Sequence, residues 1–259
     1  SPELRYTYLP MSHRKALQPN NMLVMGIRGS GKSFWWSALQ MPKHRETIGK
    51  SFGLDKETVV SKGFGEKPAP EDYPGKDTLS LLCSSFDSRL IWRTVVFKHV
   101  CGSTAPKEFK SLREWKQRVQ WLKTNPEQVE NCLYQADKAA RKHHIVLFDA
   151  LDRTADDWKT MNRLVSGLLQ TALDFRVYDK IRLKIFARPD QVENTEVLSF
   201  PDSSKIISEK AELSWPRNEL YGLLWQHLAN VDDGKIFRDG CQKLIINLRW
   251  DSSDGLFTV

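Results

Sequence analysis

The stretch that decides the fold is Met22-Leu23-Val24-Met25-Gly26-Ile27-Arg28-Gly29-Ser30-Gly31-Lys32-Ser33. Its first four residues are apolar and predict a short buried strand. The next eight, Gly26–Ser33, match the pattern G-x-x-x-x-G-K-[ST] at every fixed position. A helix is expected to begin near Lys32. A strand, a glycine-rich loop and a helix in this order are the context in which the pattern binds the phosphates of a nucleotide.

The residue types in this loop suit a triphosphate. Glycines let the backbone fold around the phosphates with several N–H groups pointing inward, and the N-terminal end of the following helix adds positive potential. Lys32 is expected to reach the β- and γ-phosphates, and the Ser33 hydroxyl to ligate Mg²⁺. The predicted ligands are therefore ATP and Mg²⁺. The residues assigned to nucleotide binding are Gly26, Arg28, Gly29, Ser30, Gly31, Lys32, Ser33 and Phe34.

Beyond the loop, predicted strands alternate with predicted helices. Apolar runs indicate strands at Ile145–Phe148, Leu183–Ala187 and Ala211–Leu213. Helical periodicity indicates helices over residues 79–100, 111–123, 126–141, 156–175 and 217–228. This alternation predicts an α/β fold of three layers, with a mostly parallel central sheet covered by helices on both faces.

Two parts are expected along the chain. Residues 1–210 form a nucleotide-binding core, which is interrupted around 41–78 by an irregular insertion with breakers such as Gly63-Phe64-Gly65. Residues 211–259 form a C-terminal helical lid and a terminal segment. In the 217–228 helix, four leucines are expected to face inward, namely Leu220, Leu223, Leu224 and Leu228.

A second acidic position follows the strand Ile145–Phe148. Asp149 ends this strand, and in phosphate-loop enzymes an Asp at such a position holds Mg²⁺ from the side opposite the loop. The alternative interpretation is an acid that caps the next helix, because Asp156 and Asp157 follow closely. The phosphate loop upstream favours the metal role, so Ser33 and Asp149 are the predicted Mg²⁺ ligands.

The segment Phe148-Asp149-Ala150-Leu151-Asp152-Arg153 resembles the Asp-Asp-Leu-Asp-Arg motif of KAP-type P-loop NTPases, which are related to STAND-type and AAA+ proteins. The resemblance covers the loop and residues 145–228. It implies an additional strand between the two nucleotide motifs, a polar sensor at Arg188, and a helical lid. It also implies a Mg-dependent ATPase that couples hydrolysis to conformational change or assembly, with bacterial antiviral defence as the biological setting.

One position departs from the motif. Ala150 stands where many hydrolysing relatives place an acid that polarises water, and its side chain has no polar atom. We expect Asp152 to supply the general base or water-orienting group. The alternative is that Asp152 pairs with Arg153 or Arg188 and holds the sensor in place. The predicted catalytic residues are thus Lys32, Asp149, Asp152 and Arg188.

Two other functions fit the same loop. One is a small-molecule kinase or other phosphotransferase, in which the 41–78 insertion provides a pocket for the second substrate. The other is a nucleotide-gated scaffold with little turnover. Phosphate release without an acceptor separates the ATPase from the kinase, and tight ATP binding without release favours the scaffold.

The composition of the chain indicates which partners and which cellular compartment to expect. The chain has 39 Lys and Arg against 32 Asp and Glu, a net charge of +7. This mild excess suits polyanions, but no dense basic tract indicates nucleic acid. No apolar run reaches the length of a membrane helix, and the cysteines are scattered, as is typical of free thiols in the cytoplasm. Besides ATP, the expected partners are further copies of the chain or a larger protein complex.

Overall fold

Five parallel strands form the central sheet of the computed structural model, which describes residues 2–102, 104–243, 249–251 and 256–258. The strands are β1 (Leu23–Met25), β2 (Val59–Phe64), β3 (His144–Phe148), β4 (Ile181–Ala187) and β5 (Ala211–Glu212). Their order across the sheet is β2-β3-β4-β1-β5. The prediction of a parallel α/β fold is confirmed. β4 lies between β1 and β3, so an additional strand separates the phosphate loop from Asp149.

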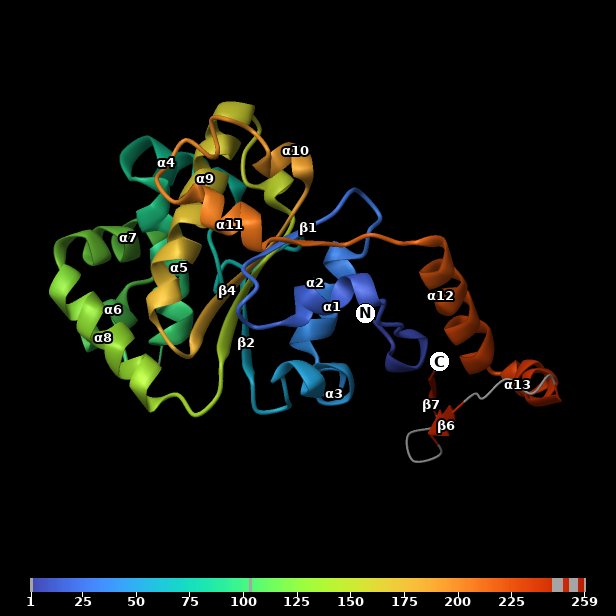
Figure 1. Cartoon of the computed structure of the whole chain (residues 1–259). Helices are drawn as coiled ribbons and strands as arrows, with labels where there is room; N and C mark the ends of the chain where they lie inside the picture. The colour runs from blue at the N-terminus through green and yellow to red at the C-terminus, as the bar shows by residue number, and fades with distance from the viewer. Residues whose placement is uncertain (1, 103, 244–248, 252–255, 259) are drawn as a thin grey trace.

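Helices cover both faces of this sheet (Figure 1). One face carries α1 (Arg14–Leu17), α2 (Lys32–Gln40) and α3 (Pro42–His44). The other carries α5 (Ser88–Val100) and α9 (Trp158–Asp174), with further helices outside or beside them. These are α4 (Lys76–Ser85), α6 (Lys107–Ser111), α7 (Trp115–Thr124), α8 (Pro126–Ala139), α10 (Pro189–Val192) and α11 (Ser203–Glu209). The three-layer arrangement follows directly from the alternation of strands and helices along the chain.

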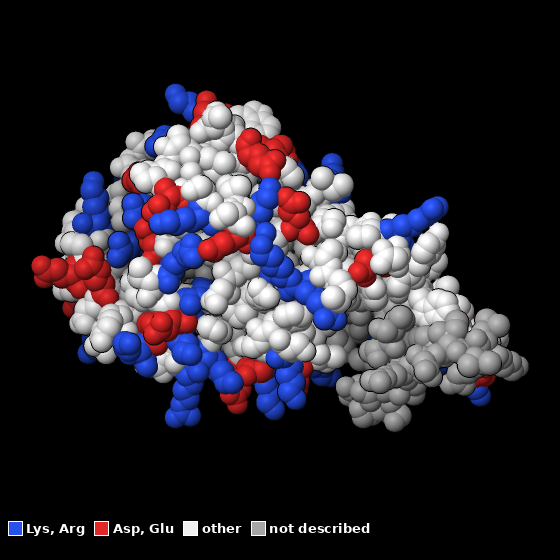
Figure 2. Space-filling model, viewed as in Figure 1, with Lys and Arg blue, Asp and Glu red and all other residues white. Residues whose placement is uncertain are grey.

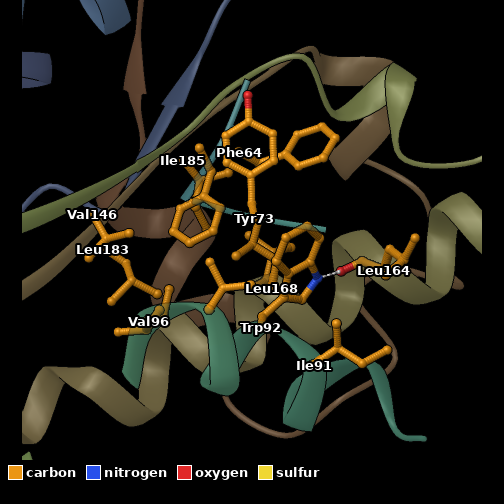
Figure 3. Packing of buried hydrophobic residues seen from close by; sticks show 14 of the residues in the cluster. Phe64, Tyr73, Ile91, Trp92, Val96, Val146, Leu164, Leu168, Leu183 and Ile185 are labelled. Carbon is orange, nitrogen blue, oxygen red and sulfur yellow. Dashed lines mark hydrogen bonds between the residues drawn. The ribbon is translucent and has the colours of Figure 1, made fainter. Parts of the chain in front are cut away.

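Alternating side chains of the strands supply two hydrophobic cores. Ile145 and Leu147 of β3 pack toward α2, whereas Val146 and Phe148 pack toward α5 and α9. In the larger core, the indole of Trp92 donates a hydrogen bond to the Leu164 carbonyl at 2.8 Å (Figure 3). This bond ties α5 to α9 and satisfies the one polar atom of a fully buried side chain.

One polar side chain is buried within the sheet. Lys184 of β4 is fully buried, and its ammonium donates to the carbonyls of Gln18 and Asn21 at 2.9 and 2.7 Å. Burial lowers the pKa of Lys184 to about 7. The two bonds fix the lead-in segment just before β1, because a buried cation without partners would destabilise the fold.

The expected irregular insertion around 41–78 is wrong in one important respect, since it contains the edge strand β2. Gly63, which reads as a breaker in the sequence, lies inside this strand. A Cβ at Gly63 would meet the Phe148 ring at 2.4 Å and Val146 at 2.8 Å. The glycine therefore allows β2 to lie against β3 at this point. Before the strand, short turns run through η3 (Arg45–Gly49) and η4 (Lys50–Phe52).

Replacing Gly63 with alanine is expected to destabilise the protein by about 2 kcal/mol, because the Phe148 ring and its neighbours must move. Chemical denaturation of the variant measures this change. Gly75→Ala is the matched control, since nothing lies within 4 Å of a Cβ there and its φ of −70° suits alanine. Equal stability of the two variants would contradict the close approach of β2 to β3.

Two helices differ from their predicted bounds. The predicted helix 79–100 is two helices, α4 and α5, with a break at Phe86-Asp87 where Asp87 caps α5 by accepting from the Arg89 N–H at 2.8 Å. The helix predicted from residue 111 begins at Trp115. The remaining predicted helices and strands are present within two or three residues of their expected ends.

The C-terminal part contains the expected helix α12 (Arg217–Asn230) and a second helix that was not predicted, α13 (Gly234–Lys243). Both extend away from the sheet (Figure 1) and are followed by the short strands β6 (Arg249–Asp251) and β7 (Leu256–Thr258). The predicted inward face of α12 is wrong. Leu220, Leu224 and Leu228 are 47%, 54% and 38% exposed, and Glu219 and Gln226 are buried instead. The polar face of α12 is buried because its side chains form hydrogen bonds with the lead-in segment before β1. No helix among the described residues has the length and apolar character needed to cross a membrane.

Candidate functional site

The phosphate loop connects the carboxyl end of β1 to α2. Gly29 and Gly31 have φ angles of +83° and +103°, which glycine adopts at low cost. The Ser30 N–H donates to the Ile27 carbonyl at 3.2 Å, closing a tight turn. The carboxyl edge of a parallel sheet is where α/β proteins bind ligands. The loop therefore lies between a strand and a helix at the carboxyl edge of the sheet, as the sequence predicts.

Lys32 lies at the start of α2 and points back across the loop. Its ammonium donates to the carbonyls of Gly26 and Ile27 at 2.7 and 2.8 Å. Burial lowers the pKa of Lys32, while the nearby charge of Asp149 raises it. The loop thus holds a partly buried cation beside the N-terminal end of α2, which is a suitable environment for a phosphate group.

Asp149 meets Ser33 at the centre of the site. Asp149 is buried, with 5% of its surface exposed. Burial raises the pKa of Asp149, and hydrogen bonds from the Ser33 hydroxyl and the Ala150 N–H, with the charge of Lys32, oppose that rise. The two predicted Mg²⁺ ligands are therefore in contact although they are far apart in the sequence.

These oxygens fit the preferences of Mg²⁺. The ion takes one or two protein oxygen ligands and completes its shell with waters and substrate phosphates, so one hydroxyl and one buried carboxylate are a sufficient protein contribution. The described residues contain no cluster of three or more His, Cys, Asp and Glu side chains of the kind that binds a metal without a substrate.

Ala150 turns the chain sharply after β3. Its φ of 57° and ψ of 40° are left-handed, a conformation that costs alanine roughly 1 kcal/mol. The turn leads into the short 3₁₀ helix η5 (Leu151–Arg153). This bend directs Asp152 and Arg153 back toward the cleft, where both are lining residues.

Replacing Ala150 with glycine should therefore stabilise the protein by up to about 1 kcal/mol, since glycine adopts this conformation freely. Denaturant titration measures the effect. Ala139→Gly, at the right-handed end of α8, is the control and should lower stability by roughly 0.5–1 kcal/mol. The left-handed geometry at Ala150 would be refuted by a loss of stability equal to that of the control.

Arg188 follows β4 and pairs with two acids. Its guanidinium donates to both oxygens of Asp190, at 3.0 and 3.3 Å from Nε, and lies 3.5 Å from Asp152. Arg188 accordingly lowers the pKa of Asp190. Of the two interpretations of Asp152, the structure shows the pairing with Arg188. The predicted sensor thus stands at the expected strand end, held by carboxylates on two sides.

Two further residues of the cleft were not predicted from sequence. Glu66 comes from the loop after β2 and bonds to Arg153 at 2.7 Å. Gln191 is 2% exposed, accepts from the Arg188 N–H at 2.9 Å, and its Nε2 has no hydrogen-bond partner among the described residues. Recognising β2 as a strand would have indicated Glu66, because polar residues at the carboxyl ends of adjacent parallel strands lie close together.

Together these residues surround a cleft of about 450 Å³. Most of the predicted site residues line it, whereas Gly26 and Ser30 shape the loop from behind. The lining side chains and backbone include Arg28, Gly29, Gly31, Lys32, Ser33, Phe34, Glu66, Asp149, Asp152, Arg153, Arg188 and Gln191. None of the described lining residues comes from α12 or α13.

A larger cavity of about 820 Å³ lies between α5, α8 and α9, away from the loop. Arg89 and Lys205 at its rim already pair with Asp174 and Asp202 at 2.5 and 2.9 Å. Size alone favours this cavity, but the smaller cleft is the better candidate site because the phosphate motif, a buried carboxylate and a sensor-type arginine converge there.

Comparisons with models of known protein families, with curated proteins and with solved structures found no match for this chain. The functional assignment therefore depends on the chemistry of the cleft itself.

Proposed function

We propose that this protein binds Mg·ATP at the loop Gly26–Ser33 and hydrolyses it. The observation that carries the proposal is the convergence of Lys32, the Ser33–Asp149 pair and Arg188 in one cleft at the carboxyl edge of the sheet. Backbone N–H groups of the loop and Lys32 bind the phosphates. Ser33 and Asp149 hold Mg²⁺, which when bound neutralises charge on the β- and γ-phosphates. Arg188 offsets the charge that develops on the transferred phosphoryl group.

The sheet order supports an ATPase of the additional-strand class that the motif resembles. β4 separates β1 from β3, and it places Arg188 between the phosphate loop and Asp149. In this position the guanidinium can respond to the γ-phosphate and, through its pairs with Asp152 and Asp190, to the rest of the cleft.

Contacts behind the loop support coupling of the nucleotide to α12. The Trp215 indole, just before α12, donates to the Ser30 carbonyl at 3.0 Å. Fully buried His13 accepts from the Trp35 indole at 2.9 Å and lies 3.1 Å from the Ser214 carbonyl. A change in the loop on binding phosphates is therefore transmitted to the base of α12, which then acts as a nucleotide-responsive lid or lever.

The surface favours protein partners over nucleic acid. The exposed leucine stripe of α12 is the kind of apolar surface that protein interfaces use, in a homo-oligomer or a larger complex. On the face seen in Figure 2, Lys and Arg are interspersed with Asp and Glu, so no continuous basic surface is presented there. A defence role in a bacterial cytoplasm remains the biological setting that the motif resemblance implies.

One observation favours phosphotransfer as a second candidate. A cavity of about 370 Å³ adjoins the cleft and shares Glu66, Asp152 and Arg153 with it. A small acceptor substrate bound there would lie beside the γ-phosphate.

Phosphate release from ATP by the purified protein, with Mg²⁺ and without any acceptor, tests the proposal. Mg-dependent release supports the ATPase. Formation of ADP only after addition of an acceptor, with the phosphoryl group on that acceptor and not released as phosphate, supports phosphotransfer. Calorimetric ATP binding without formation of ADP supports a nucleotide-gated scaffold. Absence of ATP binding would refute all three functions.

A further inference from the structure

We propose that Glu66 accepts the proton of the water that attacks the γ-phosphate, a role that rests on the proposed ATPase activity. Glu66 lies just past the carboxyl end of β2. The Asp149 N–H donates to the Phe64 carbonyl at 3.1 Å, so the ends of β2 and β3 are hydrogen-bonded side by side. Two residues beyond this bond, Glu66 lines the same cleft as Lys32 and Ser33.

The other carboxylates of the cleft have different partners. Asp149 is buried against the Ser33 hydroxyl and is suited to the metal. Asp190 binds Arg188 through both of its oxygens, and Asp152 lies 3.5 Å from the same guanidinium. Arg188 lowers the pKa of Asp190, which weakens that carboxylate as a base. Asp152 shares the same arginine, so both acids already have a partner within the sensor group.

Among the described residues, the partner of the Glu66 carboxylate is Arg153 at the surface. The pair spans 2.7 Å, and the side chains of Glu66 and Arg153 are 64% and 56% exposed. Exposed ion pairs contribute little to stability, so this pair separates at small cost. Separation frees the Glu66 carboxylate for a water and leaves Arg153 available to the phosphates. From the loop after the neighbouring strand β2, Glu66 thus supplies the acid that is missing at Ala150.

The step is a direct displacement by water. The water oxygen forms a bond to the γ-phosphorus while the bond from that phosphorus to the β–γ bridging oxygen breaks, and its electron pair stays with ADP. One proton of the water passes to the Glu66 carboxylate and is later released to solvent. The products are ADP, inorganic phosphate and a proton.

Glu66→Gln tests this role by removing the basic oxygen while keeping the size of the side chain. We expect phosphate release to fall by roughly 100-fold, ATP affinity by calorimetry to change less than about twofold, and the bound nucleotide to remain ATP when the complex is denatured and separated by chromatography. Glu66→Asp should keep more turnover than Glu66→Gln. Asp152→Asn should also lose less turnover than Glu66→Gln does. Glu57→Gln, an exposed glutamate just before the other end of β2, is the matched control and should resemble the wild type.

Wild-type turnover in Glu66→Gln would overturn the proposal while leaving the ATPase intact. A loss of ATP affinity in Glu66→Gln as large as its loss of turnover would also overturn it. A larger loss of turnover in Asp152→Asn than in Glu66→Gln would overturn it in favour of Asp152 as the base. If the wild-type protein binds ATP but releases no phosphate, the proposed hydrolysis itself is wrong, and the role of Glu66 is wrong with it.

Discussion

Lys32→Ala is expected to weaken ATP binding by about 100-fold, which corresponds to about 3 kcal/mol. The variant removes the cation that we propose reaches the β- and γ-phosphates, and charge-assisted hydrogen bonds in a partly buried site are the strongest kind. Lys32 already lies over the loop, bonded to the Gly26 and Ile27 carbonyls, so it is positioned for this contact. Isothermal titration calorimetry with Mg·ATP measures the loss.

The same two bonds mean that Lys32→Ala also removes contacts within the loop, so folding must be checked separately. A thermal melt close to that of the wild type shows that the loss lies in binding. Lys116→Ala, at an exposed position of α7, is the control and should bind ATP normally. An unchanged dissociation constant for Lys32→Ala would disprove the assignment of Gly26–Ser33 to phosphate binding.

The parts of the site that the sequence predicts are those set by local chemistry. The loop is predictable because its glycines, Lys32 and Ser33 stand at fixed spacing within ten residues. Asp149 is predictable because it ends an apolar strand. The contact between Ser33 and Asp149 then follows from the parallel sheet, whose strand ends lie along one edge.

The features of the fold and the site that the sequence does not predict depend on what each residue packs against. Gly63 is a breaker in most contexts, but here it permits close packing with Phe148, so β2 and consequently Glu66 were missed. The leucine stripe of α12 is visible in the sequence, whereas the hydrogen bonds that turn it outward involve residues more than 200 positions away. Glu219 accepts from the Tyr8 hydroxyl at 2.6 Å and the Met11 N–H at 3.1 Å.

Asp149→Asn is expected to affect turnover and metal-free ATP binding to very different extents. Mg-dependent phosphate release should fall by at least about 100-fold, because even outer-shell partners of a bound metal contribute 10- to 100-fold and Asp149 is assigned a direct ligand role. Binding of ATP without metal should change little, since the variant keeps the shape of the side chain and leaves Lys32 in place. Turnover assays and calorimetry in EDTA measure the two quantities.

Without ligands, Asp149→Asn should be more stable than the wild type at neutral pH. Burial raises the pKa of Asp149, so the folded state resists its ionisation more than the unfolded state does. Between the ordinary carboxyl pKa and the raised value, the folded protein holds a proton that the unfolded chain has released, and the stability of the wild type falls as the pH rises. Above the raised value this penalty is constant. The stability difference between the two proteins should therefore be present at pH 7 and disappear below the ordinary carboxyl range, as denaturation curves across pH will show. A variant that is less stable at every pH would mean that the Asp149 carboxylate stabilises the end of β3 and is not a buried charge that costs the unliganded fold stability.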